Sequence, residues 1–356
     1  MATTWKFYLT SDEAWDAMYA DCQSARETID IEQFIMQYEP ATKRFFELFM
    51  DKARSGVRVR VLCDMVGSYQ IYESPVIRDL QDAGIEVQFV HPVSAWRVPN
   101  WTSWAFRDHR KLLVIDGTIA HTGGVGLNQK TKAWRDTNIR LTGPVVDQMQ
   151  RAYDQMWQSV KEDKPIRSRQ SREFVEGFTF LTDTPWFRSR LFYQNLLGTI
   201  KHAQRSIYLT TPYFVPPLRL FRRLRQAARR GIEVRLLLPM SSDFRIVDYA
   251  MQSFFTLALK SGIKIYRYRA GMMHAKVGVI DEEWATVGST NLDNLSFLFN
   301  HEANIVTMRG ECIEELKRHF FEDLENAEEV RFETWTRRFL GWKILELLTW
   351  PIHSFL

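Results

Sequence analysis

Residues 271–291 read GMMHAKVGVIDEEWATVGSTN and place a histidine and a lysine two positions apart on a predicted apolar strand. Much earlier, FRDHRKLLVIDGTIAHTGG at 106–124 repeats the pattern. Both stretches contain His-x-Lys-x4-Asp and reach a Gly-containing turn seven residues after the Asp. The motif residues are His109, Lys111 and Asp116 in the first copy and His274, Lys276 and Asp281 in the second. Two matched copies in one chain indicate a duplication.

The similarity between the two halves extends well beyond these motifs. ARSGVRVRVLCD, from Ala53, matches ARRGIEVRLLLP, from Ala228, and DAGIEVQFV, from Asp82, matches KSGIKIYRY, from Lys260. In each stretch a predicted amphipathic helix ends at a Gly and a β-branched apolar strand follows, as in α/β sheets. Because the same order of elements occurs twice, we predict an α/β fold made of two similar lobes.

We predict an N-terminal lobe over residues 1–165, a C-terminal lobe over 166–330 and an amphipathic tail over 331–356. The charged segment KEDKPIRSRQSRE at 161–173 is the predicted linker. If the lobes pack about a pseudo-two-fold axis, the two motifs meet in one active site between them.

The composition limits the class of protein. A chain of 356 residues with 45% hydrophobic and 25% charged residues is typical of a folded globular protein, and a net charge of +4 does not indicate a wholesale nucleic-acid binder. The three cysteines, none in a Cys-x-x-Cys pair, favour a reducing compartment. Since the sequence has no secretory signal and no run of 18 uncharged apolar residues, we expect a cytoplasmic, soluble or peripheral protein.

Two lysines and two histidines in one pocket suit phosphoryl transfer. Lys111 and Lys276 can offset the charge on phosphate oxygens, as a metal would elsewhere, so we predict no metal and no cofactor. One of His109 and His274 can attack phosphorus while the other protonates the leaving oxygen and later deprotonates the incoming hydroxyl. The near-symmetry permits either histidine as the nucleophile. If the chain had only one such motif, the better interpretation would be a core histidine with its hydrogen bonds satisfied, beside a lysine that extends its ammonium group to solvent.

A histidine nucleophile needs an acceptor at its second ring nitrogen. Asp136 and Glu302 are candidates, because they lie 27 and 28 residues after His109 and His274. The alternative for Asp136 is a surface salt bridge with a neighbouring arginine, and the matched spacing argues against it.

Four further residues belong to the two motif regions. Ser289 and Asn291 follow a Gly on a turn and can donate hydrogen bonds to a phosphate. Asp116 and Asp281 count as motif residues of the candidate site, but they close their strands. We expect both to bond the backbone or a turn rather than to act in catalysis.

At these residues the sequence resembles the phospholipase D superfamily, whose signature is two His-x-Lys-x4-Asp motifs, and most of all its bacterial cardiolipin synthase branch. The resemblance covers about residues 5–330 and includes TTPYFVP (210–216), VGSTNLD (287–293) and WRDTNIRLTGP (134–144). It implies an enzyme that joins two phosphatidyl lipids through a phosphatidyl-histidine without a metal. Phosphatidylglycerol is the implied donor, and phosphatidylethanolamine is a further candidate substrate.

The resemblance also assigns roles to the candidate residues. It makes His109 and His274 the nucleophile and acid–base pair and gives phosphate binding to the two lysines. Three positions depart from the pattern, and they bear on the head-group preference. Gly126 stands where the second copy has Asn291, Leu295 stands where an Arg is usual, and His301 stands where an aromatic residue is common.

Three segments could contact lipid. Residues 91–106 carry three tryptophans and could rim a lipid access path or pack over a sheet edge. Residues 338–356 suit an interfacial helix, with packing onto the core as the competitor. The arginine-rich helix predicted over 219–231 could attract anionic lipid or be only a solvated face. We expect peripheral binding on the inner face of the cell membrane and leave the oligomeric state open.

Two other functions compete with lipid transfer. The same chemistry with water as acceptor would give a phospholipase D or a nuclease-type phosphodiesterase; the weak net charge and the tryptophan-rich insertion count against a nuclease. A non-catalytic lipid-binding descendant would not need both His–Lys pairs intact. The sequence therefore favours a membrane-bound phosphatidyltransferase.

Overall fold

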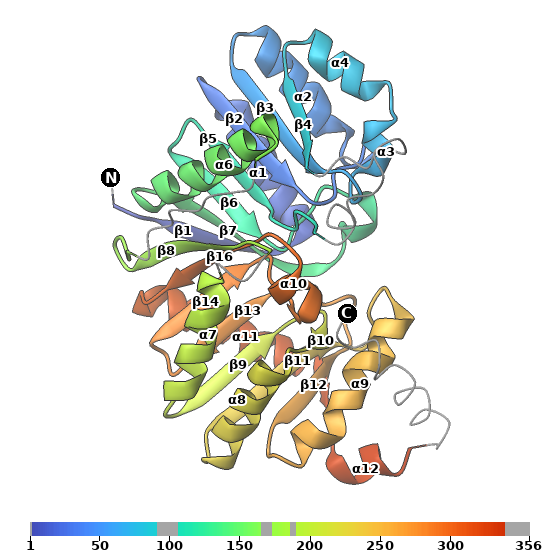
Figure 1. The fold of residues 1–356 in the computed structure, drawn as a ribbon, viewed down its shortest axis with the longest axis vertical. Coiled ribbons are helices and arrows are strands. Elements are labelled where there is room, and N and C mark those ends of the chain that lie inside the picture. Colours follow the sequence, from blue (N-terminus) through green and yellow to red (C-terminus); the bar gives the residue numbers. More distant parts are fainter. Residues whose placement is uncertain (1, 91–105, 165–172, 186–189, 339–356) are drawn as a thin grey trace.

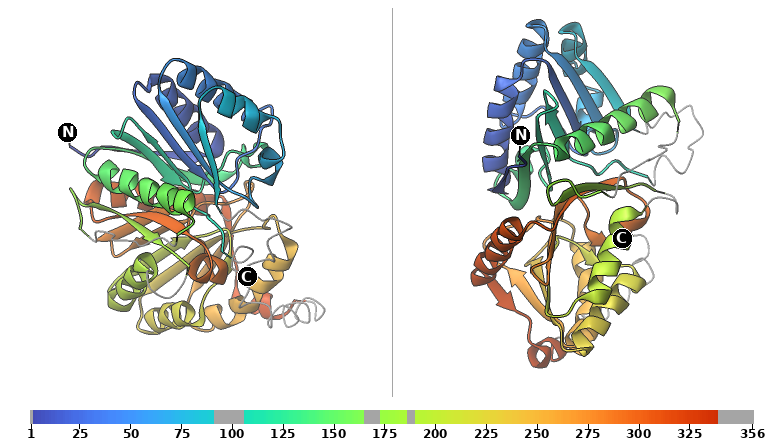
Figure 2. Two further views of the ribbon diagram at one scale, coloured as in Figure 1. Left: turned by 45° about the horizontal axis from the view of Figure 1, so that its top comes forward. Right: turned by 90° about the vertical axis from the view of Figure 1, so that its left-hand side faces the viewer.

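The chain forms two α/β lobes stacked along the long axis of the molecule (Figure 1). This computed structural model describes residues 2–90, 106–164, 173–185 and 190–338. In both views of Figure 2 the lobes meet along one junction, where β6 and β7 of the first lobe contact β14 and β16 of the second. The predicted two-lobed α/β fold is confirmed.

In its described residues the first lobe contains a seven-stranded sheet and five α-helices. Its strands are β1 (Trp5–Thr10), β2 (Thr28–Gln33), β3 (Arg58–Asp64), β4 (Glu86–Val90), β5 (Leu112–Ile115), β6 (Ile119–Gly123) and β7 (Arg135–Thr142). Its described helices are α1 (Ser11–Ser24), α2 (Lys43–Arg54), α3 (Tyr69–Tyr72), α4 (Val76–Asp82), the 3-10 turn η1 (Gln129–Thr131) and α6 (Val145–Glu162).

The second lobe contains an eight-stranded sheet and a two-stranded one. Its strands are β8 (Phe178–Asp183), β9 (Ser206–Thr210), β10 (Phe214–Val215), β11 (Glu233–Pro239), β12 (Lys264–Tyr268), β13 (Val277–Ile280), β14 (Trp284–Gly288), β15 (Leu292–Asp293), β16 (Glu302–Thr307) and β17 (Ala327–Glu329). Its described helices are α7 (Leu191–His202), α8 (Leu218–Arg229), α9 (Arg245–Leu259), α10 (Asn294–Leu298), α11 (Gly310–Glu325) and α12 (Phe332–Thr336).

The two main sheets have the same strand order. The first runs β1-β7-β6-β5-β2-β3-β4, and the second, read from β8, runs β8-β16-β14-β13-β9-β11-β12 with β17 added at its edge. In each sheet the motif strand pairs antiparallel with the first strand of the parallel half, as β5 does with β2 and β13 with β9. The duplication read from the sequence is therefore a duplication of topology.

The four repeated Gly residues end their helices as the sequence predicts. Gly56, Gly84, Gly231 and Gly262 all lie at φ values between 89° and 94°, a left-handed conformation that costs glycine little. A parallel strand begins within two residues of each of them. This shared turn sets the helix-to-strand connection in both lobes.

The hydrophobic core has three parts, and one of them is shared by the lobes. Leu112 and Val114 of β5 face a cluster that also contains Val279 of the second lobe, together with side chains of α6 and α11. The alternate residues Leu113 and Ile115 face a cluster confined to the first lobe. Because successive strand residues point to opposite faces, each motif strand packs both its own lobe and the junction.

The predicted linker and the predicted tail both include helical residues. Helix α6 continues to Glu162, so the first residues of the predicted linker 161–173 are helical, and 165–172 lie outside the described residues. In the predicted tail, α12 packs on α9 and buries Trp335. Residues 339–356 and the tryptophan-rich segment 91–105 lie outside the described residues. No described helix is long and apolar enough to cross a membrane.

The motif aspartates are structural in their contacts. Asp116 and Asp281 both adopt left-handed φ values, 49° and 55°. Each carboxylate accepts hydrogen bonds from three consecutive backbone N–H groups, at residues 26–28 for Asp116 and 204–206 for Asp281, over 2.6–2.9 Å. They tie the motif strand to the start of its neighbour, at the sheet edge away from the histidines.

We expect Asp116→Ala to lower the free energy of unfolding by about 2–4 kcal/mol, because it removes an ionised acceptor of three hydrogen bonds. Asp163→Ala is the matched control, since Asp163 also lies at a left-handed φ, 51°, but is exposed at the end of α6. Urea unfolding followed by circular dichroism measures both. Equal losses in the two variants would mean that backbone conformation, and not the hydrogen bonds, makes the contribution.

Candidate active site

The two motif histidines meet at the junction of the lobes because each motif pairs with the opposite lobe. The segment ahead of β5 forms a parallel bridge between Asp108 and His301, and the segment ahead of β13 forms one between Met273 and Arg135. The N–H of His109 donates to the carbonyl of His301 over 3.0 Å, and the N–H of His274 donates to that of Arg135 over 2.7 Å.

This pairing corrects one prediction. The His–Lys pairs were expected on the motif strands, but β5 begins at Leu112 and β13 at Val277, just after Lys111 and Lys276. The pairs lie instead in extended segments that leave their own sheet. The backbone N–H of each histidine bonds to the other lobe, and the regular ladder of its own sheet starts one residue after each lysine.

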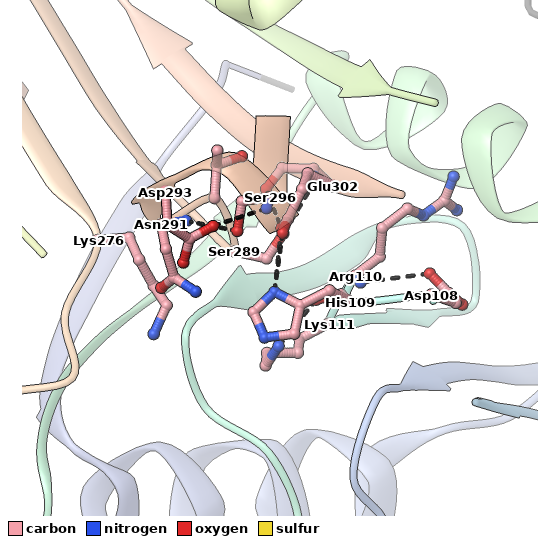
Figure 3. Close-up of polar contacts among 12 residues, drawn as sticks. Asp108, His109, Arg110, Lys111, Lys276, Ser289, Asn291, Asp293, Ser296 and Glu302 are labelled. Carbon is pink, nitrogen blue, oxygen red and sulfur yellow. Dashed lines mark hydrogen bonds and ion pairs between the residues drawn. The ribbon is translucent and has the colours of Figure 1, made fainter. Parts of the chain in front are cut away.

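The first histidine–carboxylate pair is His109 with Glu302. The Nδ1 atom of His109 lies 3.0 Å and 3.1 Å from the two carboxylate oxygens of Glu302 (Figure 3). The hydroxyl of Ser289 donates to the same carboxylate, and the hydroxyl of Ser296 is a further donor. An acceptor at Nδ1 holds the proton there and leaves Nε2 with a free lone pair.

The second pair is His274 with Asp136, again across the junction. The distance from Nδ1 of His274 to Oδ2 of Asp136 is 2.6 Å. The orienting carboxylates are thus those that the sequence predicts. Their spacing of 27 and 28 residues suggests a partner in the same lobe, whereas each histidine is bound by the carboxylate of the other lobe.

Both motif lysines lie within the same buried group. The ammonium of Lys111 donates to the carbonyl of His109 over 2.8 Å, and that of Lys276 donates to the carbonyl of His274 over 2.6 Å. The Lys276 Nζ also lies 3.0 Å from each ring nitrogen of His274. All four basic residues of the two motifs are therefore gathered at one place.

Burial shifts the pKa values of this group away from the charged forms of its bases. Burial and the ammonium of Lys276 lower the pKa of His274 to about 4, and burial with both lysine charges lowers the pKa of His109 well below its usual value. Burial also lowers the pKa of Lys111 to about 8 and that of Lys276 to about 7. The neutral imidazoles are therefore poised as bases and nucleophiles.

The two carboxylates differ in charge balance. Burial raises the pKa of Glu302 to about 8, although Lys111 and the Ser289 hydroxyl oppose the shift. Burial would also raise the pKa of Asp136, but His274 and Lys276 outweigh it and the net pKa lies below its usual value. The pseudo-symmetric site is therefore electrostatically asymmetric, with the firmer negative charge beside His274.

A glycine and a serine at equivalent turns underlie this asymmetry. A Cβ atom on Gly124 would lie 2.1 Å from Oδ1 of Asp136, so the short Asp carboxylate occupies the space of a missing side chain. At the equivalent turn of the second lobe, Ser289 is present and bonds the longer Glu302. This exchange was not predicted from the sequence, although GG at 123–124 against GS at 288–289 was the signal for it.

Asn291, predicted to donate to phosphate, is buried in the second half-site beside Asp293 (Figure 3). Its side-chain oxygen has no hydrogen-bond partner among the described residues, while its side chain bonds Asp293. Burial raises the pKa of Asp293 to about 7. The first lobe has Gly126 at the equivalent turn, so the two half-sites present different polar groups.

Aromatic rings around the histidines were not predicted as site residues. The ring of Phe34 lies 5.0 Å from that of His109, and Trp134 lies 5.0 Å from His274. Tyr213 lies 6.5 Å from His274. Trp134 and Tyr213 belong to the stretches WRDTN and TTPYF, so their adjacency to the orienting carboxylate and to a strand end was the available signal. These rings place apolar surface beside both imidazoles.

The described residues contain no group of three or more His, Cys, Asp and Glu side chains placed to hold a metal ion. The site pairs each carboxylate with an imidazole instead. What this arrangement offers chemically is two imidazoles and two lysine ammonium groups within one buried group, which suits an anionic phosphorus centre.

We expect Gly124→Ala to separate Asp136 from His274, because the added Cβ would occupy the position of the carboxylate oxygen. The downfield Nδ1–H proton resonance of His274 should disappear, while that of His109 remains. Gly126→Ala is the control, since its nearest contact would be an ordinary 3.4 Å from the Ile35 carbonyl oxygen. An unchanged His274 resonance in Gly124→Ala would contradict this description of the turn.

Comparisons with known proteins agree with this geometry. The family described as "Cardiolipin synthase, PLD-like domain" matches residues 18–157 and 196–324, one segment in each lobe. The chain is 31% identical to a cardiolipin synthase of Geobacillus sp. (strain WCH70), covering 97% of this chain and 71% of that protein. It is 33% identical to one from Geobacillus kaustophilus (strain HTA426), with 92% and 67% covered. It is 30% identical to cardiolipin synthase A of Pseudomonas putida (strain GB-1), with 97% and 74% covered.

Solved structures share the fold at low sequence identity. The phosphatidylserine synthase of Haemophilus influenzae Rd KW20 has a TM-score of 0.76 at 15% identity, covering 99% of this chain and 95% of that one. The polyphosphate kinase of Porphyromonas gingivalis has a TM-score of 0.63 at 13% identity, covering 93% and 49%. Both histidine–carboxylate pairs lie within the matched family segments. The chain therefore belongs to the cardiolipin synthase family of phospholipase D-like proteins.

Proposed function

We propose that this protein is a phosphatidyltransferase of the cardiolipin synthase type, with phosphatidylglycerol as donor and a second phosphatidyl lipid as acceptor. The observation that carries the proposal is the buried group at the junction, in which two imidazoles, each held at Nδ1 by a carboxylate of the other lobe, lie beside two lysines. The family and the named relatives support the same activity.

In the first half-reaction, Nε2 of one histidine attacks the phosphorus of phosphatidylglycerol. A phosphorus–nitrogen bond forms, the phosphorus–oxygen bond to the head group breaks, and glycerol leaves with a proton from the other histidine. That histidine must carry the proton first. The bound phosphodiester favours this, because its negative charge opposes the lysine charges that hold the imidazole pKa values down.

In the second half-reaction, the histidine that gave up its proton removes one from the hydroxyl of the acceptor lipid. The acceptor oxygen attacks phosphorus, the phosphorus–nitrogen bond breaks, and the product joins two phosphatidyl groups. Lys111 and Lys276 stabilise the added negative charge on the phosphate oxygens in both transition states. We assign the orienting role to Asp136 and Glu302, and phosphate contact to Asn291 and to the turn at Ser289.

A phospholipase D using water is the second candidate function. The side chains of His109 and His274 are only 11% and 13% exposed, and the rings of Phe34, Trp134 and Tyr213 lie around them, which favours an alcohol acceptor. Transfer over hydrolysis requires that water be scarce beside the phosphorus–nitrogen bond. The site is therefore better suited to transfer than to hydrolysis.

We further propose that the protein acts on phosphatidylglycerol, with phosphatidylethanolamine as an additional substrate that donates its phosphatidyl group and releases ethanolamine, while bound peripherally to the inner face of the cytoplasmic membrane. Its substrates are lipids, so the site must reach a bilayer surface. Nucleic acid is disfavoured as a substrate by the modest net charge of +4.

The direct test is to incubate the purified protein, with EDTA, on phosphatidylglycerol vesicles with and without phosphatidylethanolamine, and to identify the products by lipid mass spectrometry. The proposal predicts a lipid with two phosphatidyl groups and free glycerol. Phosphatidic acid as the sole product would instead identify a hydrolase, and no product from any phospholipid would refute the proposal.

We expect His109→Ala and His274→Ala each to lower turnover by at least about a thousandfold, since each removes either the nucleophile or the acid–base group. Quenching in detergent at neutral pH, which preserves an acid-labile phosphorus–nitrogen bond, should trap a protein that carries acyl label but no head-group label only in the variant that keeps the nucleophile. The matched control is His202→Ala, at the exposed end of α7. Near-normal turnover in either motif variant would contradict a shared site.

The pH dependence should report the lysines. Because the ammonium form binds phosphate, kcat/KM for a short-chain soluble lipid should fall as the pH rises through about 7 to 8, the pKa values of Lys276 and Lys111. Lys276→Arg should move the start of this fall from about pH 7 to about pH 8, because a guanidinium stays charged. The position of the fall is the readout, whatever the maximal rate; an unmoved profile would contradict the assignment.

A further inference from the structure

The edge of each sheet that carries the active site can be traced through the strand pairing. Leu112 of β5 lies opposite Glu32 near the end of β2, and Val277 of β13 lies opposite Thr210 at the end of β9. The histidines, just before β5 and β13, therefore lie at the carboxyl ends of the parallel strands. Segments that follow β2, β3, β9 and β11 share this edge, since these strands run parallel within each lobe.

In the first lobe, exposed hydrophobic side chains gather at this edge. Tyr38 follows β2, and Val66, Tyr69 and Tyr72 follow β3, at and just before α3. All four are large hydrophobic residues with two-fifths or more of their surface exposed. Scattered exposed residues of this kind need no explanation, but a set confined to one edge does.

The second lobe repeats the arrangement. Phe244 and Ile246 follow β11 at the start of α9, Leu218 begins α8, and Leu295 lies in α10 after β15. Phe244 and Ile246 thus stand at the same topological position as Val66 and Tyr69 in the first lobe. The helices α3 and α9 that carry these positions lie on the same side of the molecule in Figure 1.

Among the described residues, most of the exposed large hydrophobic side chains lie at the active-site edge. Eleven such side chains are exposed in the described residues, and the eight named above lie at this edge. The other three lie toward the opposite edge: Phe174 precedes β8, Leu257 is near the end of α9, and Met308 follows β16. We call the eight residues the apolar rim.

Charge beside the apolar rim identifies its partner. Arg219 and Arg245 are both exposed, Arg219 next to Leu218 and Arg245 between Phe244 and Ile246. Apolar side chains flanked by arginines match the boundary between acyl chains and phosphates at a bilayer surface. Matched apolar positions at the active-site edge of both lobes suit a lipid surface better than a soluble partner.

We propose that the apolar rim is the surface by which this protein docks on a phospholipid bilayer, with the active-site edge of both lobes facing the membrane. The proposal rests on the proposed function for its lipid substrate and adds the surface and the orientation. It assigns membrane contact to the N-terminal end of α8 and not to its whole arginine-rich face. Arg225 of that face is engaged with Ser261 and Phe221 of the protein itself.

The test compares two double variants of the full chain that add the same charge. Phe244→Asp with Ile246→Asp changes the rim, and Leu257→Asp with Met308→Asp changes the opposite edge, where Met308 is 57% exposed, as is Phe244. Binding is measured by co-sedimentation with vesicles of phosphatidylglycerol and phosphatidylcholine. The rim variant should bind at least about tenfold more weakly than the wild type, and the control should bind normally.

Further readouts separate docking from folding and from chemistry. Both double variants should keep the wild-type thermal unfolding and the wild-type turnover of a short-chain soluble lipid. Arg219→Glu should weaken vesicle binding, and the loss should be larger at higher phosphatidylglycerol content. Arg229→Glu, at the other end of α8, should leave binding unchanged. Equal weakening by the two double variants, or by neither, would overturn the proposal. A wild type that binds vesicles through the rim but turns over no lipid would refute the proposed function alone.

Discussion

The geometry of the site depends on two short backbone bridges between the lobes. The residue before each histidine, Asp108 or Met273, pairs with the residue before the carboxylate of the opposite lobe, His301 or Arg135. Since backbone pairing fixes register, a one-residue slip would turn every side chain to the other face and separate each histidine from its carboxylate. The bridges therefore make the site a property of the assembled pair of lobes.

The site gathers charge that is costly to bury without a partner. Lys111, Lys276 and the two imidazoles lie within one desolvated group, and the two lysine charges depress the pKa values of His109 and His274. In the proposed reaction, an anionic phosphodiester supplies the missing negative charge. Its binding would relieve the repulsion among the bases and favour the protonated form of the acid histidine. The proposal thus uses the same electrostatic arrangement for phosphate binding and for proton transfer.

Much of this organisation could be predicted from the sequence because it is local. The duplication, the glycines that end the helices and the motif histidines follow from residue patterns within a few positions of one another. The structural role of Asp116 and Asp281 was also predictable, because a polar residue that closes a strand finds backbone donors nearby. The fold and the residues that form the site could be predicted from the sequence in this way.

What the sequence did not predict depends on the packing of one lobe against the other. The spacing of Asp136 and Glu302 matches each with the histidine of its own half, and only the junction exchanges the partners. The space that Gly124 leaves for Asp136 is likewise a distance between strands. The confinement of exposed side chains such as Val66 and Phe244 to one edge follows from strand direction in both sheets, which single segments do not reveal.

The exchange of partners across the junction is tested most directly by the tautomers of the two histidines. Nitrogen-15 NMR at neutral pH should find both His109 and His274 protonated at Nδ1. Asp136→Ala should alter the tautomer of His274 alone, and Glu302→Ala that of His109 alone. If Asp136→Ala altered His109, its neighbour in the same lobe, and left His274 unchanged, the account of a site shared between the lobes would be contradicted.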